Sequence, residues 1–319
     1  MNKPFYIDVT LRDGGHQVNF DWDMSYVEDH FHTVAKIKNL TFIELGYWKQ
    51  TSKSSKDFYH LNEEILKKLC NIEVECRFSI MVDYHYCSHN LEDYPKKEDF
   101  PKLDLIRICS RSQDVNEAVK FAAALKEYTG LKTSLNFFNI TNYTEDMIID
   151  AVNKGVRANA DFIYFADTHG ALDLLKEKEK YKNFLNIIRE NGIHPGIHLH
   201  DHSGKAYLNY RIGLELGFES FDYSLLGMGK GVGNLKMEYV VDNDVSAYLM
   251  DLANKYEELL QMPNGVFGLI TSNTSSTDYY SNEARKLGLK PTDLYKYLTE
   301  ADALTRDVFD PDFLKKKTK

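Results

Sequence analysis

Short apolar runs alternate with longer, partly polar stretches along most of this chain. Runs of about four to eight residues, rich in β-branched and aromatic side chains and bounded by turn residues, are typical of strands. We predict eight strands, at Phe5–Leu11, Phe42–Leu45, Val74–Met81, Leu105–Ile108, Thr133–Phe138, Phe162–Ala166, Gly196–Leu199 and Phe221–Leu225.

The stretches between these runs carry apolar residues three or four positions apart, the spacing of an amphipathic helix. After the first strand, this spacing is seen at Val27, Phe31, Val34 and Ile37. It recurs at Ala118, Phe121, Ala122 and Leu125, at Tyr181, Phe184, Leu185 and Ile188, and at Ala206, Tyr210, Gly213, Leu214 and Gly217. Each helix would therefore pack one apolar stripe on a sheet. The third connection, Tyr84–Pro101, is mostly polar and gives the weakest evidence for a helix.

Eight alternating strand and helix units favour a closed (β/α)8 TIM barrel, with an open doubly wound sheet as the alternative. Polar residues alternate along at least six of the strands: Arg12, Glu44, Arg107, Ser134, Asn136, His198, His200 and Asp222. Most lie near the C-terminal ends of the strands, which surround a single site in a barrel but not in an open sheet. We therefore predict a catalytic barrel over residues 1–253 and a helical extension over 254–319.

Within the extension, the sequence predicts short helices at Asn282–Leu287 and Pro291–Leu304, and a frayed basic tail over residues 315–319. Pro291 suits the first turn of a helix, where its missing N–H has no partner to lose.

Composition narrows the class of protein. The net charge of −9 argues against a nucleic-acid partner, which would require a basic face. No apolar run is long enough to span a membrane, and no apolar segment typical of a signal peptide precedes the first strand. The four cysteines lack the spacing of a zinc or redox motif, so we expect reduced thiols in a cytoplasmic protein.

The first strand ends in the segment Asp8–His16, which carries a guanidinium, a carboxylate and an imidazole close together. Side chains two apart on a strand share a face, so Asp8, Thr10 and Arg12 are expected on one polar face that meets a ligand. Asp13 then leaves the strand, and the glycines that follow allow a sharp turn.

The segment His198-Leu199-His200 is the second candidate for chemistry, because both imidazoles would point into the barrel. Two imidazoles and one carboxylate facing one spot are a recurring arrangement for a divalent metal, and Asp13 is the candidate carboxylate. The alternative for His-x-His alone is a pair of hydrogen-bonded polar side chains.

Two further segments are candidates for the same site. The loop Gly227–Asn234 could bind phosphate through its backbone N–H groups, or simply be a flexible connection, and Asn234 could supply an oxygen ligand. Asp167 could orient a ligand or cap the next helix.

Together these segments resemble the HMG-CoA lyase-like family, also called the DRE-TIM metallolyases or the pyruvate-carboxyltransferase domain. The similar blocks, in chain order over about residues 5–240, are Thr10–Gly14, Ile43–Gly46, Ala166–Gly170, His198–His200 and Gly227–Asn234. Single blocks are weakly specific, whereas several in register are strong. The resemblance implies a TIM barrel that makes or breaks carbon–carbon bonds with a divalent metal.

Within this family the chain is most similar to the 4-hydroxy-2-oxovalerate aldolases, which carry a catalytic histidine at the position of His16. The resemblance implies that Arg12 and His16 are catalytic, and that Mn²⁺ or Mg²⁺ is held by Asp13, His198, His200 and Asn234. Expected substrate contacts are Glu44, Arg107, Asn136, Asp167, Gly229 and Gly231. The chain departs from the family pattern at Asp201-His202 and at Phe267, where the aldolases carry a tyrosine that helps as an acid.

The activity implied is cleavage or formation of a 4-hydroxy-2-oxo acid through a pyruvate enolate. A Claisen-type synthase that condenses an acyl-CoA with a 2-oxo acid is one alternative, and a barrel that binds a metal or metabolite without turnover is another. The expected partners are a small 2-oxo acid and an aldehyde, with a homodimer and an aldehyde-consuming dehydrogenase as further candidates.

Overall fold

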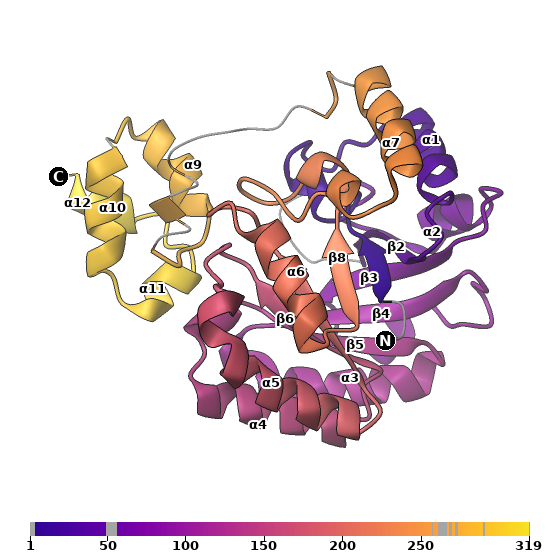
Figure 1. Ribbon diagram of the computed structural model, residues 1–319, viewed down its shortest axis with the longest axis horizontal. Helices are drawn as coiled ribbons and strands as arrows, with labels where there is room; N and C mark the ends of the chain where they lie inside the picture. The colour runs from indigo at the N-terminus through magenta and orange to yellow at the C-terminus, as the bar shows by residue number, and fades with distance from the viewer. Residues whose placement is uncertain are drawn as a thin grey trace.

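A computed structural model describes residues 4–48, 56–256, 258–260, 267, 270–271, 274–289 and 291–318. Its strands form one closed parallel barrel in chain order (Figure 1). They are β1 (Phe5–Asp8), β2 (Leu40–Tyr47), β3 (Arg77–Asp83), β4 (Leu103–Ser110), β5 (Lys132–Phe137), β6 (Phe162–Asp167), β7 (His194–Leu199) and β8 (Ser220–Tyr223). Because β8 pairs with β1, the sheet has no open edge, and the predicted (β/α)8 TIM barrel is confirmed.

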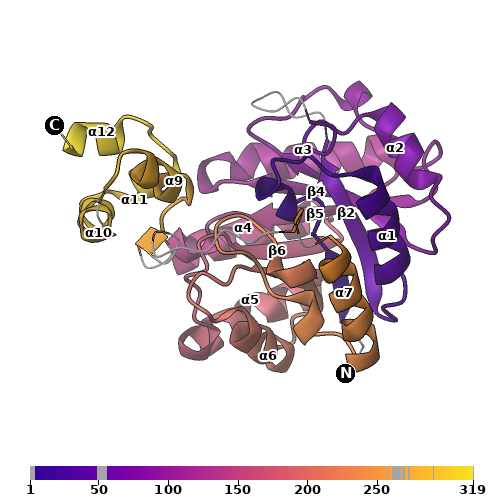
Figure 2. The same ribbon diagram turned by 90° about the horizontal axis from the view of Figure 1, so that it is seen from above.

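Helices cover the outside of the barrel (Figure 2). They are α1 (Met24–Val34), α2 (Glu63–Cys70), α3 (Val115–Thr129), α4 (Glu145–Arg157), α5 (Leu174–Glu190), α6 (Ala206–Leu216) and α7 (Asn243–Lys255). The predicted apolar stripes are buried, as Val27, Phe31 and Val34 of α1 illustrate. Between β3 and β4, all of which the structure describes, the only helical turn is the 3-10 segment Leu91–Asp93, as the polar third connection indicated.

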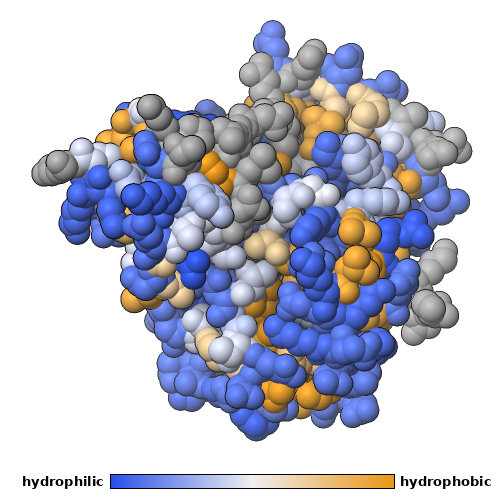
Figure 3. All heavy atoms as spheres, turned by 60° about the vertical axis from the view of Figure 1, so that its left-hand side comes forward, coloured by the Kyte–Doolittle hydropathy of each residue, from blue (hydrophilic) through white to orange (hydrophobic). Residues whose placement is uncertain are grey.

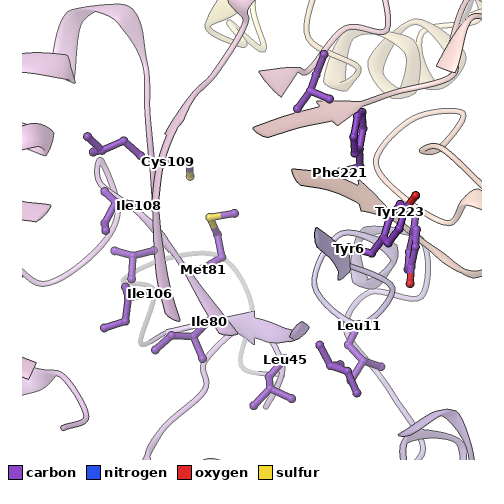
Figure 4. Packing of buried hydrophobic residues seen from close by; sticks show 14 of the residues in the cluster. Tyr6, Leu11, Leu45, Ile80, Met81, Ile106, Ile108, Cys109, Phe221 and Tyr223 are labelled. Carbon is purple, nitrogen blue, oxygen red and sulfur yellow. The ribbon is translucent and has the colours of Figure 1, made fainter. Parts of the chain in front are cut away.

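The main core lies between the strands and the surrounding helices. Figure 4 shows Ile80 of β3 with Ile106 and Ile108 of β4 in this layer. At the closing seam, the rings of Tyr6 and Tyr223 stack with centroids 5.3 Å apart. A second, smaller cluster fills the barrel interior near the N-terminal ends of the strands and is called the lower lumen layer: Ile7, Val9, Phe42, Leu105, Phe162 and Tyr164.

The C-terminal helices lie beside the barrel (Figures 1 and 2, yellow). They are α9 (Tyr279–Lys286), α10 (Pro291–Glu300), α11 (Ala303–Asp307) and α12 (Phe313–Lys317). They pack on their own apolar cluster: Ile270, Tyr280, Ala284, Leu294, Leu298 and Leu314. Leu314 is fully buried, and the expectation of a frayed tail over residues 315–319 is wrong for residues 315–317, which belong to helix α12. The molecular face on this side is mostly hydrophilic, with smaller hydrophobic patches (Figure 3).

One strand boundary differs from the prediction. The domain boundary at residue 253 stays a prediction, and helix α7, which packs against α1, continues to Lys255. Strand β1 ends at Asp8, because Asp8 Oδ1 accepts a hydrogen bond from Thr10 N at 2.9 Å and begins a turn. Among the described residues, no helix is both long and apolar enough to cross a bilayer.

The early end of β1 overturns the expected polar face. Asp8 Oδ2 lies 2.6 Å from His30 Nε2 of α1, and both residues are fully buried. Thr10 Oγ1 accepts a hydrogen bond from Leu225 N at 2.9 Å. Asp8 and Thr10 therefore bind the turn to α1 and to the segment after β8, and of the three residues only Arg12 reaches the site.

Candidate active site

Three potential metal ligands meet at the C-terminal mouth of the barrel. Asp13 lies in the turn after β1, His198 on β7, and His200 just beyond it. His198 Nε2 and His200 Nε2 are 3.1 Å apart, and Asp13 Oδ2 is 3.7 Å from each. Two ligands that are each about 2.1 Å from one ion lie about 3.0 Å apart at a right angle and up to about 4.2 Å apart when opposite. Separations of 3.1 and 3.7 Å therefore allow a shared divalent metal. The structure brings together three of the four residues predicted as metal ligands, all of them buried.

Asn234, the fourth predicted ligand, is adjacent. It forms an isolated bridge with His200, and its Nδ2 donates to Asp13 Oδ2 at 2.7 Å and to the Met228 carbonyl at 3.0 Å. Its Oδ1 is buried without a hydrogen-bond partner among the described residues. In this structure Asn234 therefore orients the Asp13 carboxylate through its nitrogen, and its role as an oxygen ligand stays a prediction.

Electrostatics favour the protonation states that bind a metal. Burial alone would raise the pKa of Asp13, but Arg12, whose Nη1 is 2.5 Å from Asp13 Oδ1, holds that pKa well below its usual range, with help from the imidazoles. Burial lowers the pKa of His200 well below that of a free histidine. An ionised carboxylate and a neutral imidazole are the forms that ligate divalent ions.

A chain of buried charges lies under the ligands and is called the ionic layer: Arg12, Glu44, Arg107 and Asp222. Glu44 accepts from Arg12 Nε at 2.5 Å and from Arg107 Nη1 at 2.9 Å. Arg107 Nη2 donates to Asp222 Oδ2 at 2.7 Å. The same Oδ2 lies 2.9 Å from His198 Nδ1, and an ionised Asp222 makes that ring nitrogen the donor. This interaction orients the His198 ring so that its Nε2 faces the ligand cluster.

Four of the six predicted substrate contacts lie behind the ligand cluster, and their contact with substrate stays a prediction. Glu44 and Arg107 are fully buried and bonded to each other and to the rest of the ionic layer. Asn136 Oδ1 accepts from Ser134 Oγ at 2.7 Å. Asp167 Oδ1 accepts from the amides of residues 171 and 172, so Asp167 holds the loop after β6. None of the four lines the cavity above the ligands.

That cavity, called the central cavity, measures about 110 Å³. The predicted residues Arg12, Asp13, His16, His198 and His200 all line it. The sequence interpretation missed other lining residues, among them Tyr47, Asp83, Tyr86, Arg111 and Tyr279. Asp83 ends β3 and binds Arg111, which follows β4, through two contacts of 2.9 and 3.2 Å. Their position at the C-terminal ends of strands was the available signal for this pair.

His16 lies at the edge of the central cavity, with Nε2 3.4 Å from the Tyr47 hydroxyl. Burial lowers the pKa of His16 to about 4, so its imidazole is neutral at pH 7 and can accept a proton. On Arg12, Nε and Nη1 are taken by Glu44 and Asp13, whereas Nη2 has no partner among the described residues. The site thus combines a cluster of candidate metal ligands, a neutral imidazole and a guanidinium with donor capacity.

Comparisons with known proteins agree with this geometry. The sequence model of the HMGL-like family matches residues 105–264. An oxaloacetate decarboxylase of Mycobacterium tuberculosis is 22% identical over 244 residues, which cover 75% of this chain and 69% of that protein. A 2-isopropylmalate synthase of Methanocaldococcus jannaschii is 26% identical over 168 residues, and this match covers 49% of the chain but only 32% of the synthase.

Among solved structures, the N-terminal domain of a proposed aldolase from Bacteroides vulgatus is similar in fold. It superposes with a TM-score of 0.67 at 21% identity, and the match covers 93% of this chain and 97% of that one. At this identity the likeness supports the barrel fold alone.

Proposed function

We propose that this chain, which belongs to the HMGL-like family of metal-dependent enzymes, is an aldolase that cleaves or forms a 4-hydroxy-2-oxo acid through a pyruvate enolate. The observation that carries the proposal is the meeting of Asp13, His198 and His200 in one cavity with His16 and Arg12. The resemblance of this set to the 4-hydroxy-2-oxovalerate aldolases supports the finer assignment. The 2-oxo acid and aldehyde belong to the same proposal, and the homodimer and the dehydrogenase partner stay predictions.

Mn²⁺ or Mg²⁺ on Asp13, His198 and His200 would supply Lewis acidity that stabilises negative charge on a 2-oxo acid. Mn²⁺ accepts mixed nitrogen and oxygen ligands, whereas Mg²⁺ prefers oxygen, so this donor set favours Mn²⁺.

His16 would accept the proton, and Arg12 would stabilise the negative charge that develops. In cleavage, His16 accepts the proton of the C4 hydroxyl while the C3–C4 bond breaks, and the electron pair of that bond forms the enolate. Arg12 Nη2 is available to donate to the enolate oxygen, and removing one such donor typically costs about 10²–10³-fold in rate. Protonation of C3 from water then gives pyruvate, the proton held by His16 returns to solvent, and the other product is an aldehyde.

The Claisen-type synthase remains the second candidate, because the chain has 2-isopropylmalate synthases among its relatives. The two reactions differ in which substrate loses a proton. An aldolase activates the methyl group of pyruvate, whereas the synthase activates the methyl group of an acyl-CoA.

The test is proton exchange in D₂O with Mn²⁺, followed by NMR. We expect the pyruvate methyl signal to disappear in the presence of the protein and metal. Exchange of the acetyl-CoA methyl instead would support the synthase, and exchange of neither would contradict both enzyme assignments.

Two variants control this experiment. Asp13→Asn removes the only carboxylate of the ligand cluster and is expected to reduce exchange to the background rate. Asp21→Asn, which changes an exposed carboxylate further along the same loop, is expected to leave the rate unchanged. Full exchange by Asp13→Asn would contradict the metal assignment.

A further inference from the structure

A second cavity adjoins the central cavity and is called the outer cavity. It measures about 260 Å³ and lies between the glycine-rich loop after β8 and helix α9. His16, Lys230 and Tyr279 line both cavities, so the proposed base stands at the boundary between them. A substituent on the substrate carbon whose hydroxyl faces His16 can therefore extend into the outer cavity.

The outer cavity carries excess positive charge. Lys230 and Arg285 both line it, and neither forms an ion pair with any residue that the structure describes. Both instead lie near aromatic rings, with Lys230 Nζ 4.5 Å from the centre of the Tyr279 ring. One carboxylate, Asp278, also lines the cavity, and its Oδ1 accepts from Ser281 Oγ at 2.9 Å. The chain as a whole has a net charge of −9, but this cavity has two cationic side chains and one carboxylate. The cavity should therefore attract anions.

The glycine-rich loop fixes Lys230 at the boundary. A Cβ on Gly229 would lie 2.5 Å from Asn234 Nδ2, so the loop is pressed against the metal cluster. Gly231 has φ +71°, and a Cβ there would lie 2.0 Å from His202 Nε2. The Gly229 carbonyl also accepts from Gln17 Nε2 at 2.8 Å. The backbone on both sides of Lys230 is therefore closely held, which favours a defined position for its ammonium group.

We propose that the outer cavity is a subsite for an anionic group, a carboxylate or a phosphate, on the aldehyde half of the substrate. This inference rests on the proposed function. With the 2-oxo acid half at the metal cluster and the C4 hydroxyl at His16, the substituent on C4 passes His16 and meets Lys230 and Arg285. Charge-assisted hydrogen bonds from these two groups would select substrates with a negative tail.

The first experiment measures anion binding without turnover. Inorganic phosphate and succinate are titrated by calorimetry into the wild-type protein and into the Lys230→Met/Arg285→Met double variant. We expect wild type to bind at least one anion, and the double variant to bind it about 10- to 100-fold more weakly. Whichever anion binds more tightly identifies the group as phosphate or carboxylate.

Two further variants exclude a trivial loss of structure. Lys286→Met removes an exposed cation of the same helix, outside the cavity, and is expected to bind like wild type. Lys230→Arg keeps the charge and is expected to retain binding. Absence of anion binding to wild type, or equal binding by the double variant, would overturn the proposal.

The second experiment compares acceptor aldehydes in the condensation with pyruvate. The matched pairs are D-glyceraldehyde 3-phosphate with D-glyceraldehyde, and succinic semialdehyde with butanal. We expect wild-type kcat/KM to favour the anionic member of one pair by about tenfold or more, and the double variant to lose that preference. Pyruvate exchange with no preference in either pair would refute the subsite alone. Absence of pyruvate exchange would refute the aldolase, and the anion titration would then decide whether the cavity binds anions at all.

Discussion

The interior of the barrel changes character within two residues along its strands. On β2 the inward-facing position changes from Phe42 to Glu44, and on β4 from Leu105 to Arg107. Phe42 and Leu105 belong to the lower lumen layer, which is apolar apart from the Tyr164 hydroxyl, bonded to Ser220. Glu44 and Arg107 belong to the ionic layer, in which every charge has an opposite charge beside it.

The two layers serve different purposes. The lower lumen layer removes apolar surface from water and so stabilises the barrel. The ionic layer buries charges, whose desolvation offsets most of their mutual attraction, so its net contribution to stability is small. We infer that its value is orientation, because Arg12 contacts Asp13 and Asp222 contacts His198. Changes in the lower lumen layer should therefore affect the free energy of unfolding, and changes in the ionic layer should affect metal affinity. The variants below test whether the two effects are separable.

Arg107→Met should have the largest effect. It leaves Glu44 and Asp222 buried without their shared cation, which typically costs about 3–5 kcal/mol in the free energy of unfolding. Urea denaturation measures that loss, and calorimetry should show weaker Mn²⁺ binding as well. Arg77→Met, an exposed change on β3, is the control and should change neither quantity. Full stability of Arg107→Met would contradict the described pairing.

Leu105→Ala should have a similar or smaller effect on stability and none on the metal. Leu105 is fully buried in the lower lumen layer, and its truncation leaves a cavity that costs about 2–5 kcal/mol. Mn²⁺ affinity at a temperature where the variant is folded should equal that of wild type. A tenfold loss of Mn²⁺ affinity would show that the two layers are not separable.

Asp222→Asn tests orientation with little change of volume. The variant weakens the interaction that fixes the His198 ring, and loss of such an outer partner typically costs about 10- to 100-fold in metal affinity. Calorimetry with Mn²⁺ measures this loss directly. Unchanged affinity would mean that His198 is oriented by packing alone.

The smallest expected effect is a pH dependence of stability caused by Asp167, a buried carboxyl with no ion-pair partner among the described residues. Burial raises the pKa of Asp167 to about 7, whereas Arg107 lowers the pKa of Asp222 in the ionic layer despite its burial. The folded state thus binds a proton that the unfolded state releases near pH 4, so stability falls as the pH rises from about 4 to 7. Between pH 6 and pH 7 the loss should be about 1 kcal/mol.

Urea denaturation across this pH range measures the effect of Asp167. Asp167→Asn has no proton to lose, and it keeps an oxygen to accept from the loop amides. Its stability should therefore vary less with pH between 5 and 7 than that of wild type. An identical pH profile for both proteins would contradict the raised pKa.

The barrel was predictable because its signals are local. Strand runs and helical stripes repeat along the chain, and the burial of Val27, Phe31 and Val34 follows from their spacing. The clustering of the three candidate ligands was predictable for a similar reason, since His198 and His200 lie two apart on one face and Asp13 lies at a strand end. The polar third connection also indicated correctly that no α-helix would form there.

What could not be predicted depends on contacts between distant residues. Glu44 and Arg107 were expected to contact substrate. The sequence does not show that these two residues form a buried ion pair with each other. The end of β1 depends on a side-chain hydrogen bond from Asp8 that competes with strand pairing. Tyr279 and Arg285 line the cavities from helix α9 of the C-terminal extension. No sequence motif indicated that this helix lies beside the site.

The seam between β1 and β8 can form only late in synthesis. Asp13 and Asn234, which touch through a hydrogen bond, are 221 positions apart, and β1 acquires its second neighbour only when β8 is present. During synthesis, β1 can therefore pair only with β2 until β8 has been translated. A truncated chain that stops before β8 lacks the second neighbour of β1, and with it the seam that brings Asp13 to Asn234.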